Sequence, residues 1–264
     1  MDRPQATTRA IAALSGGDLR VWSLIVTILG DMARAPGAEV SGATLGALTD
    51  AVDIKPEALR VALHRLRKDG WISSRRVGRG SLHILTESGR AQANEAAARI
   101  YDFDTHQPTG WHVMVAQPMT QAGRNRLDAE LRGLGHIVIA PGAYLGQGPA
   151  PDRPDLLLLE GNALQVPTWL SAAVMPPRLL QDYVSFEQAL KVVDQALEAD
   201  KPDPLTCAVL RLLIVHGWRR LVLRHPALPD AFFPPTWRGP ACRRMLRDLL
   251  ERLGQPRGAD LLTG

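Results

Sequence analysis

Residues 55–85 combine a basic helical pattern, a glycine stop and a basic hairpin pattern, in that order. The segment holds eight Lys or Arg residues against two acidic ones, a formal charge of +6, whereas the whole chain carries only +4. Four apolar residues recur at helical spacing and predict a buried side: Leu59, Ala62, Leu63 and Leu66. Pro56 suits the first helical position, and Gly70 suits the left-handed residue that ends a helix. The segment therefore predicts a short, strongly basic helix followed by strands.

Two strands and a tight turn are expected after the glycine stop. Apolar and polar residues alternate over 71–77, glycines mark a turn at 78–80, and a second strand returns over 82–85. Upstream, residues 41–51 predict a short helix with a serine cap, and residues 52–54 form the turn that precedes the basic helix. Helix, turn, helix and hairpin is the order of a winged helix-turn-helix, whose second helix enters the major groove of DNA.

The basic helix presents a second set of side chains opposite its buried side, where they can reach bases and phosphates. Arginines at the hairpin tip can reach phosphates or the minor groove. The predicted DNA contacts are Lys55, Arg60, Val61, His64, Arg65, Lys68, Arg75, Arg76 and Arg79. An ordinary amphipathic surface helix is the alternative for residues 55–69 alone, because charge runs commonly cover solvated faces. The complete order of elements favours DNA binding.

The chain is long enough for several domains, and its patterns predict an α+β, multidomain fold. Residues 1–104 form the winged helix-turn-helix domain. It begins with a helix over 19–33 that is apolar nearly all round, and it ends with a helix from Thr86 to about Tyr101. Residues 104–110 predict a linker.

Residues 105–175 predict a small α/β sandwich of ferredoxin-like type. Its expected elements are strands at 111–115, 136–140 and 156–159 and a helix at 120–134. Residues 142–154 are rich in glycine and proline and predict a loop.

Residues 176–264 predict an all-helical domain with helices at 178–197, 205–223 and 241–253. Residues 211–257 hold ten Arg against three acidic residues. Arginines suit phosphates, and tryptophans can line an aryl pocket. The candidate effector-binding residues are Arg211, Trp218, Arg219, Arg220, Arg224 and Trp237. The alternatives are a solvated basic face, internal salt bridges and tryptophans that anchor the core.

No catalytic residue, metal site or cofactor is predicted. The two cysteines, Cys207 and Cys242, lack metal-ligand spacing, and the seven histidines form no metal-binding motif. No apolar stretch of 18 residues and no secretory signal pattern is found, so we expect a cytoplasmic protein without membrane contact.

Three stretches resemble the PaaX family of bacterial repressors of phenylacetic acid catabolism. They are SLIVTILGD at 23–31, ALRVALHRLRKDGWISSRRVGRGSLHILTESG at 58–89 and RLLIVHGWRRLVLRHPALPDAFFPPTWRGPACR at 211–243. The middle segment, opening at Trp111, is similar to that family's Cas2-like domain. The resemblance implies a homodimer that binds double-stranded operator DNA and releases it when phenylacetyl-coenzyme A or a related acyl-coenzyme A binds.

By position, the resemblance points to Arg60, His64, Arg65, Arg76 and Arg79 as DNA contacts. The chain departs from the family at its hairpin tip, GRGSLH, where Gly80, Leu82 and His83 replace basic and aromatic residues. It also departs at His225, where the family more often has Asp.

Two other functions stay open. One is an enzyme, an acyl-coenzyme A hydrolase or a Cas2-like nuclease, with a DNA-binding appendage. A metal-dependent nuclease needs carboxylates near its first strand, and WHVMV at 111–115 supplies none. The other is a DNA-binding module whose C-terminal part docks a protein partner.

Overall fold

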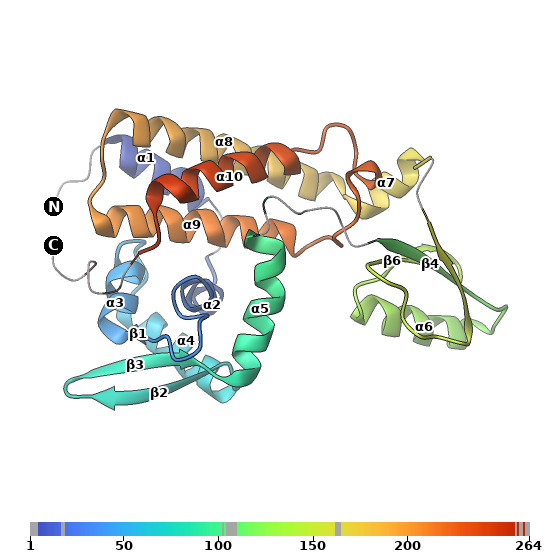
Figure 1. Cartoon of the computed structure of the whole chain (residues 1–264), viewed down its shortest axis with the longest axis horizontal. Helices are drawn as coiled ribbons and strands as arrows, with labels where there is room; N and C mark the ends of the chain where they lie inside the picture. Colours follow the sequence, from blue (N-terminus) through green and yellow to red (C-terminus); the bar gives the residue numbers. More distant parts are fainter. Residues whose placement is uncertain are drawn as a thin grey trace. The chain divides into compact units, whose positions relative to one another are not determined.

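The computed structural model describes residues 5–16, 19–101, 103, 110–161, 165–256, 258 and 261. Within them lie ten α-helices, one 3-10 helix and two antiparallel sheets, as the expected α+β, multidomain fold requires (Figure 1). The chain forms two compact units: unit 1 comprises residues 1–103, 184–220 and 239–264, and unit 2 comprises residues 104–183 and 221–238. The three-domain division with boundaries at 104 and 175 stays a prediction, and residues 104–109 of the predicted linker lie outside the described residues.

Unit 1 is built around α2 (Val21–Met32), which follows α1 (Gln5–Leu14). Leu24, Ile25 and Leu29 are fully buried. They share one core cluster with residues of the next helices, the hairpin and the C-terminal half of the chain. The apolar pattern over 19–33 thus predicted a buried helix correctly, but the expectation that it is the first helix is wrong, because α1 precedes it.

The two helices that precede the hairpin are α3 (Gly42–Asp50) and α4 (Pro56–Lys68). The Ser41 hydroxyl caps α3 by accepting from the Thr44 amide at 2.9 Å. Asp53 takes a positive φ of 59° in the turn between the helices. Gly70, with φ 73°, follows α4 in the left-handed conformation that was expected of it.

The sheet of unit 1 has the strand order β1-β3-β2, with β1 (Val40–Ser41), β2 (Ile72–Val77) and β3 (Gly80–Leu85). Val77 pairs with Gly80, so the hairpin turn consists of Gly78 and Arg79 alone. Next comes α5 (Glu87–Tyr101), whose cap is the Thr86 hydroxyl, accepting from the Gly89 amide at 3.0 Å. The helix bounds expected from Thr86 to Tyr101 are confirmed.

Three C-terminal helices contribute to unit 1: α8 (Pro177–Ala199), α9 (Pro204–Val222) and α10 (Gly239–Leu253). Gly217 on α9 lets Phe186 of α8 pack closely, because a Cβ at 217 would lie 2.7 Å from the phenyl ring. On the same helix Arg211 forms a buried ion pair with Asp31 of α2 at 2.7 Å. These contacts explain how residues far apart in sequence form one unit.

Unit 2 contains a four-stranded antiparallel sheet with the order β5-β6-β4-β7. Its elements are β4 (Trp111–Ala116), α6 (Gln121–Gly133), β5 (Ile137–Ala140), β6 (Ala143–Gln147), β7 (Leu156–Glu160), α7 (Thr168–Val174) and the 3-10 helix η1 (Asp230–Phe232). Met114, Leu131 and Tyr144 are fully buried and form the centre of its core. Thr120 caps α6 with its hydroxyl.

The expectation of a loop over 142–154 is wrong for its first part, because residues 143–147 form β6 in the interior of the sheet. Tyr144 and Leu145 are buried there. Gly146 lies beneath the histidine pair of His112 and His136, whose Nε2 atoms are 3.1 Å apart, and a Cβ at 146 would overlap both rings. A glycine that predicts a loop in sequence therefore serves close packing within a strand.

Candidate nucleic-acid interface

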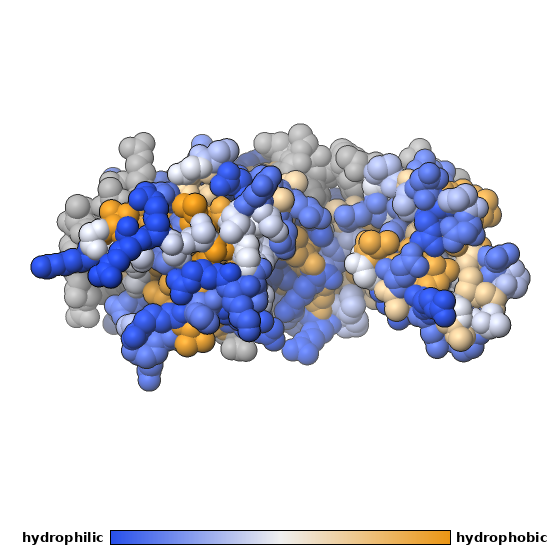
Figure 2. All heavy atoms as spheres, turned by 90° about the horizontal axis from the view of Figure 1, so that it is seen from below, coloured by the Kyte–Doolittle hydropathy of each residue, from blue (hydrophilic) through white to orange (hydrophobic). Residues whose placement is uncertain are grey.

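The helix α4 separates an apolar side from a polar side as its sequence predicts. Leu59, Ala62, Leu63 and Leu66 are all buried. On the opposite side Val61 keeps 70% of its surface exposed. Figure 2 views unit 1 from the side of α4 and the hairpin, and hydrophilic side chains predominate there.

All nine predicted DNA contacts lie in unit 1, and all nine are exposed. Six come from the N-terminal end or the exposed side of α4: Lys55, Arg60, Val61, His64, Arg65 and Lys68. Three come from the hairpin: Arg75, Arg76 and Arg79. All nine thus lie on the segment formed by α4 and the hairpin, and their role in binding DNA stays a prediction.

Several of these arginines form ion pairs with acidic neighbours in the protein without DNA. Arg60 contacts Glu57 at 2.6 Å one turn earlier on α4. Arg65 lies 3.5 Å from Asp69, and its guanidinium sits over the Trp22 ring of α2 at 5.6 Å from the ring centre. Such exposed pairs contribute little to stability, so they restrict side-chain geometry more than they strengthen the fold.

Arg75 forms a bidentate ion pair with Glu39, which the sequence did not predict. Its Nε and Nη2 donate to the two carboxylate oxygens of Glu39, at 3.0 and 2.8 Å. The Glu39 carboxylate raises the Arg75 pKa, through the hydrogen bond first and the charge second. The partners are separated by 36 residues, and no local spacing relates them.

His83, one of the departures at the hairpin tip, is buried inside the hairpin. Its Nδ1 lies 2.8 Å from the Ser74 hydroxyl and its Nε2 lies 3.0 Å from the Ser81 hydroxyl. Burial first, and the nearby Arg67 charge second, lower the His83 pKa. His83 therefore joins the two strands rather than facing outward, and strand alternation with buried Leu85 is the sequence signal for this position.

Four candidate effector residues lie on α9 within unit 1: Arg211, Trp218, Arg219 and Arg220. Arg211 is nearly enclosed and donates to the Asp31 carboxylate and to the carbonyls of Leu250 and Gly254. The Trp218 indole is buried and donates to the Ile100 carbonyl at 3.0 Å. Arg219 donates to the Ser23 hydroxyl at 3.1 Å, and burial is the main cause that lowers its pKa.

The other two candidates, Arg224 and Trp237, lie in unit 2. Arg224 pairs with Asp182 at 2.8 Å. Trp237 stacks on Phe233 with 3.9 Å between ring centres, beside His225. The six residues thus belong to two different units, and Arg211, Trp218 and Trp237 have the buried positions of structural side chains. Their role in binding an effector stays a prediction.

Among the residues that the structure describes, no group of three or more His, Cys, Asp and Glu is placed to hold a metal ion. No helix in the described part of the chain is long and apolar enough to cross a membrane.

Residues 20–89 match the family model described as PaaX-like protein, and residues 177–262 match the model of the PaaX-like protein C-terminal domain. The transcriptional repressor PaaX of Escherichia coli (strain K12) is 26% identical over 251 residues, which cover 88% of this chain and 79% of the relative.

A solved structure also has a similar fold. Uncharacterized protein Rv0674 from Mycobacterium tuberculosis superposes with a TM-score of 0.51 at 17% identity, covering 89% of this chain and 97% of the other. At this identity the likeness concerns the fold alone.

Proposed function

The chain belongs to the family of PaaX-like proteins, and we propose that it is a DNA-binding transcriptional regulator, a repressor, rather than an enzyme. The observation that carries this proposal is the exposed basic side of α4 in its structural setting. The elements follow one another as in a winged helix-turn-helix: the capped helix α3, a tight turn, α4, and a hairpin with a two-residue turn. A relative named as a transcriptional repressor supports the same function.

In the proposed mode of binding, α4 enters the major groove with its exposed side toward the base edges. Arg60 and Arg65 offer planar donors to guanine, and Val61 offers an apolar contact to a thymine methyl group. Arg76 and Arg79 on the hairpin contact phosphates, which supply affinity without sequence information. A homodimer would place two such helices in successive major grooves.

Unit 2 is proposed to be the ferredoxin-like, Cas2-like domain of the family. Support comes from the strand order β5-β6-β4-β7 and from α6, which connects β4 to β5 along the chain. In this proposal the protein acts in the cytoplasm on genes of phenylacetic acid catabolism. Phenylacetyl-coenzyme A, or a related acyl-coenzyme A, would favour a state that no longer fits the operator.

The test of DNA binding begins with selection of a preferred duplex from a random library, followed by fluorescence anisotropy at several salt concentrations. Wild-type protein is expected to bind the selected duplex, with an affinity that falls as salt rises. Arg60→Ala and Arg65→Ala are each expected to cost about 1–3 kcal/mol on the selected duplex and less on a scrambled one, because base contacts carry specificity.

Arg244→Gln provides the matched control, since Arg244 is an exposed arginine of unit 1 on α10. It should leave affinity and salt dependence unchanged. Equal losses for Arg244→Gln and Arg60→Ala would mean that net charge alone governs binding and that α4 reads no bases.

The effector is tested separately by thermal shift and by release from the selected duplex. Phenylacetyl-coenzyme A should raise the melting temperature and lower DNA affinity, while free phenylacetate and coenzyme A serve as controls. Absence of any shift with phenylacetyl-coenzyme A would reject this effector and leave the DNA-binding proposal intact. Hydrolysis of the thioester during the titration would instead support the enzyme alternative.

A further inference from the structure

The hairpin of unit 1 has two faces, and its arginines are divided between them. In antiparallel pairing, directly opposed residues point to the same face, and successive residues point to opposite faces. Ser74 pairs with His83, and Arg76 pairs with Ser81. Because His83 is buried, Ser74 and Arg76 lie on the face that turns toward the helices.

A direct contact with α4 supports this assignment. Arg67, near the end of α4, donates to the Ser74 hydroxyl at 3.5 Å. Arg76 is two residues further along β2 on the same face, and its Nε reaches the Gly78 carbonyl at the turn. Arg76 and Arg79 are therefore on the α4 side and at the tip of the hairpin.

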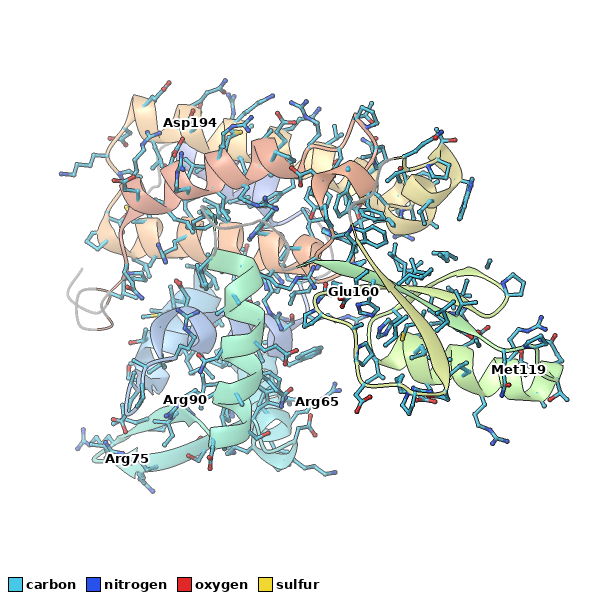
Figure 3. The ribbon with its side chains drawn as sticks, turned by 45° about the vertical axis from the view of Figure 1, so that its right-hand side comes forward. Arg65, Arg75, Arg90, Met119, Glu160 and Asp194 are labelled. Atoms are coloured by element: carbon cyan, nitrogen blue, oxygen red, sulfur yellow. The ribbon has the colours of Figure 1, made fainter. Side chains whose placement is uncertain are left out.

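Arg75 points to the other face. It pairs with Leu82, which pairs in turn with Ser41 of β1, so the three side chains lie in one row across the sheet. Glu39, two residues before Ser41, continues that face and meets Arg75 with both carboxylate oxygens. Figure 3 shows Arg75 on the hairpin and Arg65 on α4, in separate places within unit 1.

We propose that Glu39 and Arg75 form a clamp that fastens the hairpin to β1 on the face away from α4, and that Arg75 does not itself contact DNA. Glu39 is then a positioning residue for the phosphate contacts of Arg76 and Arg79. This proposal rests on the proposed DNA-binding function and revises the expectation that Arg75 is a DNA contact.

The charges of the clamp support this role. A guanidinium bound to a carboxylate through two parallel hydrogen bonds has a fixed geometry. The pair as a whole is neutral, so it releases no counterions from DNA, whereas each cation that meets a phosphate adds about 0.9 to the salt slope of log K. The Glu39 side chain keeps 27% of its surface exposed against 59% for Arg75, which places the carboxylate as the more enclosed anchor.

A charge exchange distinguishes a clamp from a DNA contact. The single variant R75E puts two acids side by side and should weaken DNA binding severalfold at low salt. The double variant E39R/R75E restores an opposite pair with the partners exchanged. Its affinity should return to within about twofold of wild type, and its salt slope should be unchanged, because no phosphate contact has been lost. Circular dichroism checks that each variant is folded.

The neutral hairpin variant R76Q is the comparison for a lost phosphate contact, with a salt slope expected to decrease by about 0.9. If E39R/R75E binds DNA as weakly as R75E, and its salt slope falls by as much as that of R76Q, then Arg75 contacts DNA and the clamp is overturned. If wild-type protein shows no salt-dependent binding to any duplex, both the clamp's role and the proposed function fail. If the wild-type protein binds DNA and only the charge exchange fails to restore affinity, the clamp is overturned and the proposed function stands.

Discussion

Asp31 and Arg211 form a buried ion pair that connects the N-terminal and C-terminal helices of unit 1. Their side chains keep only 7% and 10% of their surface exposed, and the Tyr101 hydroxyl donates to the same carboxylate at 2.8 Å. We expect Asp31→Asn to lower the free energy of unfolding by about 3–5 kcal/mol, because it leaves a buried guanidinium without its counter-charge. Urea denaturation followed by tryptophan fluorescence measures the loss.

The exposed pair of Asp182 and Arg224 provides the control for this prediction. Both side chains are more than a third exposed, so Asp182→Asn should cost less than about 1 kcal/mol. Equal effects of the two substitutions would contradict the structural role assigned to Arg211 and would leave it free for an anionic ligand.

His216 predicts how the stability of unit 1 depends on pH. Burial, and then the charges of Arg220 and Arg219, lower its pKa from 6.5 to about 4. The unfolded chain therefore takes up this proton first, so the contribution of His216 is constant above pH 6.5, and stability is lost as pH falls toward 4, by about 3 kcal/mol from this group. Urea unfolding between pH 4 and 8 measures this loss. His216→Gln should reduce this loss, and the part that remains includes the contribution of His83, whose pKa is also lowered by burial.

Among the elements, α4 was predictable because its burial repeats with the helical period in the sequence itself, and α2 because its sequence is apolar nearly all round. The exposed candidate contacts on α4 follow from the helical period. The Glu39–Arg75 contact was not predictable, because its geometry depends on how β1 and β2 flank β3. The strand β6 was missed because glycine predicts a loop locally, while packing around His112 requires it at 146.

Gly146 gives a test of that packing within the sheet of unit 2. Gly146→Ala should destabilise the unit by about 1–3 kcal/mol, because the new Cβ overlaps His112 and His136 in a closely packed site. Amide hydrogen exchange of β6 and β4 reports the loss locally.

Gly133→Ala on α6 is the matched control, since nothing lies within 4 Å of a Cβ there and alanine favours a helix by up to about 1 kcal/mol. If Gly146→Ala leaves exchange in β6 unchanged, the close approach of the two histidines is not required for the sheet.

On the scale of the whole molecule, the proposed DNA-binding segment shares its core with the C-terminal helices. The core around α2 includes Val209 and Leu213 of α9, both essentially inaccessible to solvent. The C-terminal boundary predicted for the DNA-binding domain in sequence is therefore not a boundary of its core. The helix α2 contacts both α4 and α9, the latter through the pairs Asp31–Arg211 and Thr27–His216.

This arrangement predicts the behaviour of a fragment comprising residues 1–103. Without α9 the apolar side chains that contact it become exposed, and each large one loses about 1.5–3 kcal/mol of burial. The fragment is expected to keep helical signal in the far-UV while losing fixed aromatic signal in the near-UV, to aggregate on gel filtration, and to bind the selected duplex weakly. The full chain, measured under the same conditions, should unfold cooperatively. A fragment that unfolds with the same midpoint and binds DNA as tightly as the full chain would show that α9 contributes nothing to the core of the DNA-binding segment.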